Sequence, residues 1–99
     1  MNISKITKGD LYVEPKTIVR HFGTHNGNVI IAETGIFFLH GKLFGNVYVS
    51  NNSKYLLHGT HNGEIDNNGE IIVYGVLNSK KKVTGNVDFT PEAIINIID

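Results

Sequence analysis

The sequence predicts an all-β protein, specifically a single-stranded β-solenoid (β-helix) of about five rungs. Gly-polar-aliphatic triplets begin at Gly9, Gly27, Gly45 and Gly63, which makes an 18-residue repeat, and a further triplet begins at Gly85. A second glycine series, at 23, 41 and 59, keeps the same interval. Short alternating runs rich in Val, Ile, Phe and Tyr fill the intervals, as in strands, and no stretch has a sustained helical period.

The repeat divides the chain into rungs near residues 9–26, 27–44, 45–62, 63–84 and 85–98. A unit of 18 residues holds two or three short strands with turns between them. It cannot bury its own apolar side, so we expect identical units to stack about 4.8 Å apart and form continuous ladders. The glycines supply the sharp corners, and asparagines at equivalent positions are expected to share hydrogen bonds from rung to rung.

Four inward ladders are expected from the alternation. The first strand of each rung contributes Leu11/Val29/Val47/Ile65/Val87 and Val13/Ile31/Val49/Phe89, and the second contributes Val19/Phe37/Tyr55/Ile71 and Leu39/Leu57/Val73.

The chain is expected to be one domain, residues 1–99. Residues 1–8 would be a lead-in, residues 76–84 a loop expansion, and residues 91–99 a closing segment. The alternative fold is an antiparallel β-sandwich or meander, because Asn26-Gly27, Asn62-Gly63 and Asn68-Gly69 are also hairpin signals. The solenoid is favoured, since hairpins do not require the repetition of Gly23-Thr24-His25-Asn26-Gly27 at residues 59–63.

Composition excludes several classes of function. Nine Lys+Arg balance nine Asp+Glu, which argues against nucleic-acid binding by bulk charge. The absence of cysteine excludes a disulfide scaffold, a thiolate metal site and a cysteine nucleophile. No apolar run approaches the ~20 residues of a membrane span, and the start does not resemble a signal peptide. A soluble, cytoplasmic protein without a cofactor is expected.

The pattern Gly-xxx-Gly-Asn-Val, a short strand, a turn and an aliphatic strand resembles the bactofilin-like, polymer-forming bacterial solenoids. The likeness covers about residues 9–98, including the closing Pro91-Glu92-Ala93-Ile94-Ile95-Asn96. It implies the fold, and it implies function only loosely. Bactofilins usually carry tails that bear membrane or partner contacts. With at most eight residues before its first rung, this chain departs from that pattern, which lowers the expectation of a membrane-attached filament.

Two groups of polar residues could carry chemistry. His40 and His58 share a rung position and should stack, while His25 and His61 share another position two rungs apart. Stacked side chains point in parallel instead of converging on an ion, so a surface ladder is favoured over a metal or acid–base site. Glu64, Asp66 and Glu70 are expected to cluster on one acidic rung, with Asp88 one rung further on, next to Asp66. We interpret it as a solvated patch and not as a paired-carboxylate site.

Two surfaces are candidates for binding a partner. Lys80, Lys81 and Lys82 lie in the loop expansion, where solenoids commonly add function. Phe38, Leu56 and Ile72 stand between core positions of their strands. They should therefore form an outward apolar stripe on three adjacent rungs, with Arg20 one rung earlier. Alternatively, Ile94, Ile95, Ile97 and Ile98 could fold over this stripe.

The expected function is that of a non-catalytic scaffold that binds a protein partner or itself through a flat solenoid face. One alternative is a stoichiometric inhibitor, such as an immunity protein that neutralises a bacterial toxin. A remote alternative is an enzyme or metal site that uses the histidines or the acidic rung, which the absence of catalytic motifs disfavours.

Overall fold

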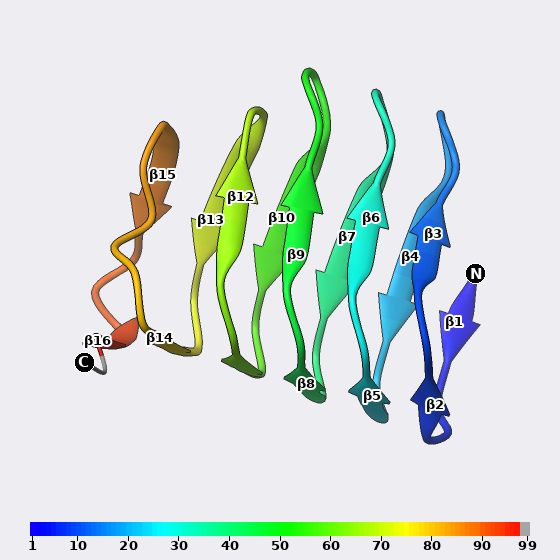
Figure 1. The fold of residues 1–99 in the computed structure, drawn as a ribbon, viewed down its shortest axis with the longest axis horizontal. Coiled ribbons are helices and arrows are strands. Elements are labelled where there is room, and N and C mark those ends of the chain that lie inside the picture. The colour runs from blue at the N-terminus through cyan, green and yellow to red at the C-terminus, as the bar shows by residue number, and fades with distance from the viewer. Residues whose placement is uncertain (98–99) are drawn as a thin grey trace.

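The computed structural model describes residues 1–97, and within them the chain forms a parallel β-solenoid of about five coils (Figure 1). The coils lie side by side along the long axis, with the N-terminus at one end and the last coil at the other. Each complete coil passes through three parallel sheets, which we call A, B and C. The described residues contain no helix, and hence none with the length and hydropathy of a membrane span.

Six strands form sheet A: β1 (Asn2–Ile3), β4 (Ile18–His21), β7 (Ile36–Leu39), β10 (Lys54–Leu57), β13 (Glu70–Val73) and β15 (Asn86–Phe89). Six more form sheet B: β2 (Thr7–Lys8), β5 (Thr24–Asn26), β8 (Lys42–Phe44), β11 (Thr60–Asn62), β14 (Val76–Ser79) and β16 (Ile94–Ile97). Sheet C has four strands: β3 (Leu11–Val13), β6 (Val29–Ile31), β9 (Val47–Val49) and β12 (Ile65–Asn67).

The register confirms the 18-residue repeat. Val29 pairs with Val47 in sheet C, and Phe37 pairs with Tyr55 in sheet A. Every strand pairing in the described residues is parallel, which excludes the antiparallel sandwich or meander. Each repeat folds into three strands because its two glycine corners and the turn between sheets C and A leave room for three short extended segments.

The core runs along the axis and is lined by one ladder or more from each sheet. The expected ladder through Phe37 is buried, and the ladder through Val29 is buried at Val29 and Val47 and partly buried at Leu11 and Ile65. Sheet B adds a ladder that was not predicted, His25/Leu43/His61/Leu77. Corner glycines allow the coils to approach closely. A Cβ at Gly41 would overlap the carbonyl oxygen of Gly23 in the preceding coil. The predicted asparagine ladder is present in sheet B, where Asn78 Nδ2 donates to Asn62 Oδ1 over 2.9 Å.

The last coil differs from the prediction. Val87 pairs with Ile71 and Phe89 with Val73, so both belong to sheet A and not to the Leu11 and Val13 ladders. The cause is the segment 80–85, which occupies the place of a sheet C strand and sends the chain directly to sheet A. The fourth coil therefore ends with β14 at Ser79, and the first four residues of the expected loop expansion are strand.

Both ends of the described part of the chain, residues 1–8 and 94–97, belong to the solenoid. Residues 1–8, expected as a lead-in, form β1 and β2, which pair with β4 and β5. Ile94, Ile95 and Ile97 lie in β16, which pairs with β14 in sheet B. They therefore do not cover the apolar stripe on sheet A, and Ile98 lies outside the described residues.

Candidate functional site: the outer face of sheet A

The predicted apolar stripe is an outward row at the centre of sheet A. Phe38 pairs with Leu56, and Leu56 pairs with Ile72, so the three side chains stack in register on β7, β10 and β13. The burial of these strands alternates, with the outer members of each triplet buried and these middle residues half-buried. The row exists because alternation in a strand sends successive side chains to opposite sides of the sheet.

A charged residue stands at each end of this row. Arg20 of β4 pairs with Phe38, and Asp88 of β15 pairs with Ile72. The Arg20 guanidinium carbon lies 4.8 Å from the centre of the Phe38 ring, a cation–π contact. Both charged residues are exposed. The order along the axis is therefore Arg20, Phe38, Leu56, Ile72, Asp88, which we call the central row.

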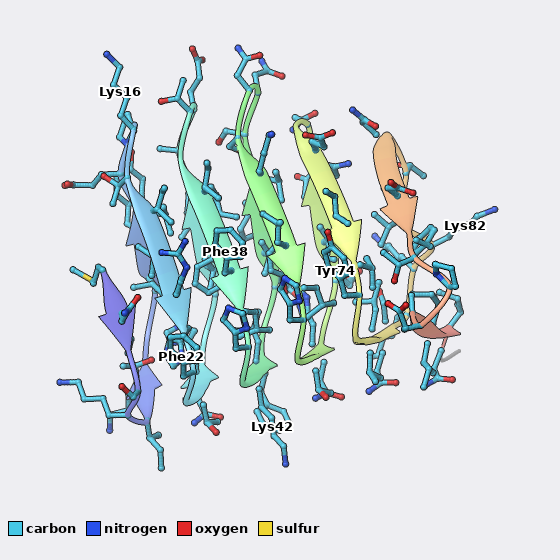
Figure 2. The ribbon with its side chains drawn as sticks, turned by 180° about the vertical axis from the view of Figure 1, so that it is seen from behind. Lys16, Phe22, Phe38, Lys42, Tyr74 and Lys82 are labelled. Carbon is cyan, nitrogen blue, oxygen red and sulfur yellow. The ribbon has the colours of Figure 1, made fainter. Side chains whose placement is uncertain are left out.

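A column of aromatic rings follows the corner where sheet A ends. Phe22 stacks on His40 with ring centres 4.7 Å apart, His40 stacks on His58 at 4.9 Å, and His58 stacks on Tyr74 at 4.3 Å. Figure 2 shows Phe22 and Tyr74 along one side of the sheet, with Phe38 on the same face. The ring of Phe38 lies 6.1 Å from His40 and 6.2 Å from His58. The ring column and the central row therefore form one continuous surface, which we call the sheet A face.

The stacking of His40 on His58 confirms a prediction, whereas Phe22 and Tyr74 were missed. A signal for them is present in the sequence, because each ring of the column directly precedes a corner glycine. Burial, and then the neighbouring His40, lowers the pKa of His58. His58 is therefore uncharged at neutral pH.

The sequence pattern predicts that His25 and His61 lie on the surface. This prediction is wrong, because both side chains are buried in the core. His61 Nε2 donates to the Gly45 carbonyl over 2.9 Å, and Nδ1 accepts from the Tyr55 hydroxyl at 3.0 Å. Burial lowers the pKa of His61 to about 4 and raises that of Tyr55 well above 10.0. Both groups are neutral and satisfied, which gives them a structural role.

A third buried histidine, His21, was not singled out in the sequence. The Thr7 hydroxyl lies 2.8 Å from His21 Nε2 and 2.6 Å from His25 Nδ1. The Gly23 N–H donates to His21 Nδ1, and His25 Nε2 donates to the Asn28 carbonyl. Because His21 Nδ1 accepts from Gly23, the ring proton of His21 is on Nε2, which donates to the Thr7 hydroxyl. Because His25 Nε2 donates to Asn28, His25 Nδ1 accepts from that hydroxyl. Burial, and then His25, lowers the pKa of His21.

Glu64, Asp66 and Glu70 lie in one coil, as expected, but Asp88 does not lie next to Asp66. Asp88 lies in sheet A and Asp66 in sheet C, so they are not neighbours. Glu64 pairs with Lys81 at 3.6 Å, and Glu70 pairs with Lys54 at 3.5 Å. The described residues contain no group of three or more His, Asp or Glu side chains placed to hold a metal ion.

Lys80, Lys81 and Lys82 are exposed on the segment that replaces the last sheet C strand. Ser79 fixes this segment, because its hydroxyl donates to the Lys81 carbonyl and accepts from the Lys81 N–H. Lys82 projects into solvent near the C-terminal end of the solenoid (Figure 2). The loop and the apolar stripe are thus separate surfaces, and Lys81 is already ion-paired with Glu64.

Sheet C also has an outward apolar row that sequence reasoning did not single out. Tyr12, Ile30 and Tyr48 pair in register, and Asp66 follows in the next coil. The same alternation that places Leu11 and Val13 inside predicts this row. It is shorter than the combined row and ring column of sheet A.

Comparison with protein-family models gives no match for the chain. Searches of curated proteins and of solved structures likewise give no significant match.

Proposed function

We propose that the protein is a non-catalytic scaffold that binds another protein chain through the sheet A face. The observation that carries the proposal is the continuity of the central row with the ring column across adjacent coils. Contiguous exposed apolar surface usually marks an interaction site. A solenoid holds such a surface rigid, because each strand is hydrogen-bonded to the coil before and after it.

The composition of the face fits a protein partner. Apolar and aromatic side chains occupy the centre, and Arg20, Asp88, Lys54 and Glu70 lie toward its margins. Protein interfaces have an apolar centre with a polar rim, and their binding energy concentrates in aromatic and arginine side chains. Phe38, which contacts both Arg20 and the ring column, is therefore the expected centre of the interface. The likeness to bactofilin-like solenoids belongs to this proposal and adds self-association to the possible modes of binding.

The test is the substitution Phe38→Asp, with Ile30→Asp as the matched control. Both side chains are half-buried, outward and central in their strands, so the two variants carry the same cost of placing aspartate in a sheet. Tagged wild-type protein and both variants are used to capture partners from the native cells, and circular dichroism monitors the fold. We expect Phe38→Asp to fold and to lose binding, and Ile30→Asp to retain it.

Two results would reject this assignment. Equal binding by wild type and Phe38→Asp would place the interface elsewhere, with Lys80, Lys81 and Lys82 as the next candidate. Binding through those exposed lysines would weaken strongly with added salt. Loss of binding in Ile30→Asp alone would place the interface on sheet C.

A further inference from the structure

We infer that the sheet A face pairs with a second copy of this chain across a two-fold axis, with the two solenoid axes antiparallel. The inference rests on the proposed function of the sheet A face and names its occupant. It follows from the order of residues along the central row.

The central row is self-complementary when it is reversed. It begins with a cation, Arg20, continues with three apolar residues and ends with an anion, Asp88. Reversal about Leu56 places Arg20 opposite Asp88 of the second copy and Phe38 opposite Ile72 of the second copy. Leu56 then lies on the axis and faces its own equivalent. A two-fold interface requires this property, because the same patch serves both copies.

The parallel arrangement of two such faces is disfavoured. It would place Arg20 opposite Arg20 of the second copy and Asp88 opposite its own equivalent. Like charges that face each other across an interface weaken association and disfavour that orientation. The antiparallel arrangement replaces these two repulsions with two attractions. Packed sheets lie about 10 Å apart, a gap that a long arginine facing a short aspartate can span.

The rows beside the central row are compatible with the same axis. In the ring column, His58 lies on the axis, His40 faces Tyr74 of the second copy, and Phe22 faces Thr90 of the second copy. On the other side, Lys54 lies on the axis. Its own Glu70, 3.5 Å away, stands in the next coil, and Glu70 of the second copy occupies the opposite side. Each Lys54 is then flanked by two carboxylates, which offsets the repulsion between the two lysines.

The charge distribution of the whole chain supports the antiparallel orientation. Residues 1–62 carry six basic and three acidic residues, whereas residues 63–97 carry three basic and five acidic residues. In the antiparallel pair, the positive half of each copy lies over the negative half of the other. This complementarity also increases the association rate at low salt.

The size of the face sets the expected strength of the pair. The molecule measures 30 × 27 × 22 Å, so one face offers about 600 Å² per copy, which is near the lower limit of specific interfaces. An interface of this size is consistent with a micromolar dissociation constant. The pair is therefore expected to form at high protein concentration and to dissociate on dilution.

The experiment is sedimentation equilibrium of the purified full chain over a range of concentrations, for wild type, R20D, D88R and R20D/D88R. We expect wild type to approach the mass of two chains and no more. Each single variant places like charges together twice, so its dissociation constant should rise by about tenfold or more. The double variant exchanges the charges and should return to within about threefold of wild type.

Mixing R20D with D88R provides a second measurement. In the mixed pair each Arg20–Asp88 contact becomes an attraction again, so the mixture should form heterodimers more strongly than either variant forms homodimers. Circular dichroism checks the fold of each variant, and the mixture requires only the two single variants to fold. A matched control is K82D, an exposed charge reversal outside sheet A, which should not raise the dissociation constant.

Several outcomes would overturn the pairing. Single variants that associate like wild type would contradict the antiparallel orientation. Mass that grows beyond two chains would indicate head-to-tail assembly through the solenoid ends. A monomer at every concentration would remove the second copy as the occupant, but it would leave intact a loss of foreign-partner capture by Phe38→Asp. The two proposals therefore fail separately.

Discussion

His61 makes the stability of the fold depend on pH in a window that the structure defines. Its folded-state pKa is lowered to about 4 from an ordinary value of 6.5, mainly because the ring is buried. As pH falls below 6.5, His61 binds a proton in the unfolded chain but not in the folded chain, and unfolding becomes more favourable. The contribution of His61 is therefore fully present above pH 6.5 and is lost progressively down to about pH 4.

The magnitude follows from the difference between the two pKa values. One unit corresponds to 1.36 kcal/mol, so protonation in the unfolded chain lowers the free energy of unfolding by about 3 kcal/mol at pH 4. That is a large part of the 5–15 kcal/mol typical of small domains. The hydrogen bonds oppose protonation as well. His61 Nδ1 accepts a hydrogen bond from the Tyr55 hydroxyl. If Nδ1 were protonated, it could no longer accept this bond, and the hydroxyl would lose its acceptor.

The variant that isolates this effect is Tyr55→Phe/His61→Leu. It copies the preceding coil, where Phe37 pairs with Tyr55 and Leu43 pairs with His61 at the equivalent positions. The replacement keeps an apolar, well-filled interior and removes the titrating ring together with its hydroxyl partner. Other ionisable groups, including His21, remain in both proteins and cancel in the comparison.

Urea unfolding followed by circular dichroism at pH 7 and pH 4 measures the effect. We expect wild type to lose about 3 kcal/mol more than the double variant over this interval. The reasoning is refuted if both proteins lose the same stability, because His61 would then not be a buried neutral ring. An unchanged unfolding slope confirms that the two denatured states are comparable.

The other predictions concern the core, the loop, a coil corner and the sheet A face. Leu57 is fully buried, so Leu57→Ala should cost about 2–5 kcal/mol in urea unfolding, whereas Lys81→Ala should cost no more than about 1 kcal/mol, the value of an exposed ion pair. Equal losses would contradict the coil assignment. Gly41→Ala should prevent folding or lower the melting temperature sharply, since its Cβ would overlap the Gly23 carbonyl oxygen. If Gly41→Ala melted at the same temperature as wild type, the corner would have room for the added Cβ and this prediction would be wrong. Phe38→Asp should abolish partner capture, and R20D/D88R should restore the pairing that either single change weakens.

The register of the central coils could be predicted from the sequence because each repeat contains the same glycine and aliphatic positions at the same spacing. Gly45-Asn46-Val47 copies Gly27-Asn28-Val29, and stacking equal units at equal intervals fixes which residues are neighbours. The outward row followed from the same reasoning, since alternation within a strand sets the side of each residue. Phe38, Leu56 and Ile72 lie where this argument placed them.

The last coil could not be predicted because its triplet is misleading. Gly85-Asn86-Val87 repeats the local pattern of Gly63-Glu64-Ile65, yet it begins a sheet A strand and not a sheet C strand. The sheet that a strand joins depends on how the preceding segment closes the coil. Here Ser79 binds the loop backbone and Val83 is buried against the core. These contacts are not encoded in the triplet itself.

The two identical pentapeptides show the same limit within the core. His25 and His61 occupy the centre of the same five-residue sequence and the same strand position of sheet B, and both are buried. Their partners differ, because Thr7 comes from the preceding coil and Tyr55 from the adjacent sheet. The shared pentapeptide therefore places both rings in the core, while residues outside the pentapeptide determine their hydrogen bonding. The same distinction applies to the sheet A face. The repeat places the outward residues in a row, and the opposite charges of Arg20 and Asp88 make the two ends of that row different.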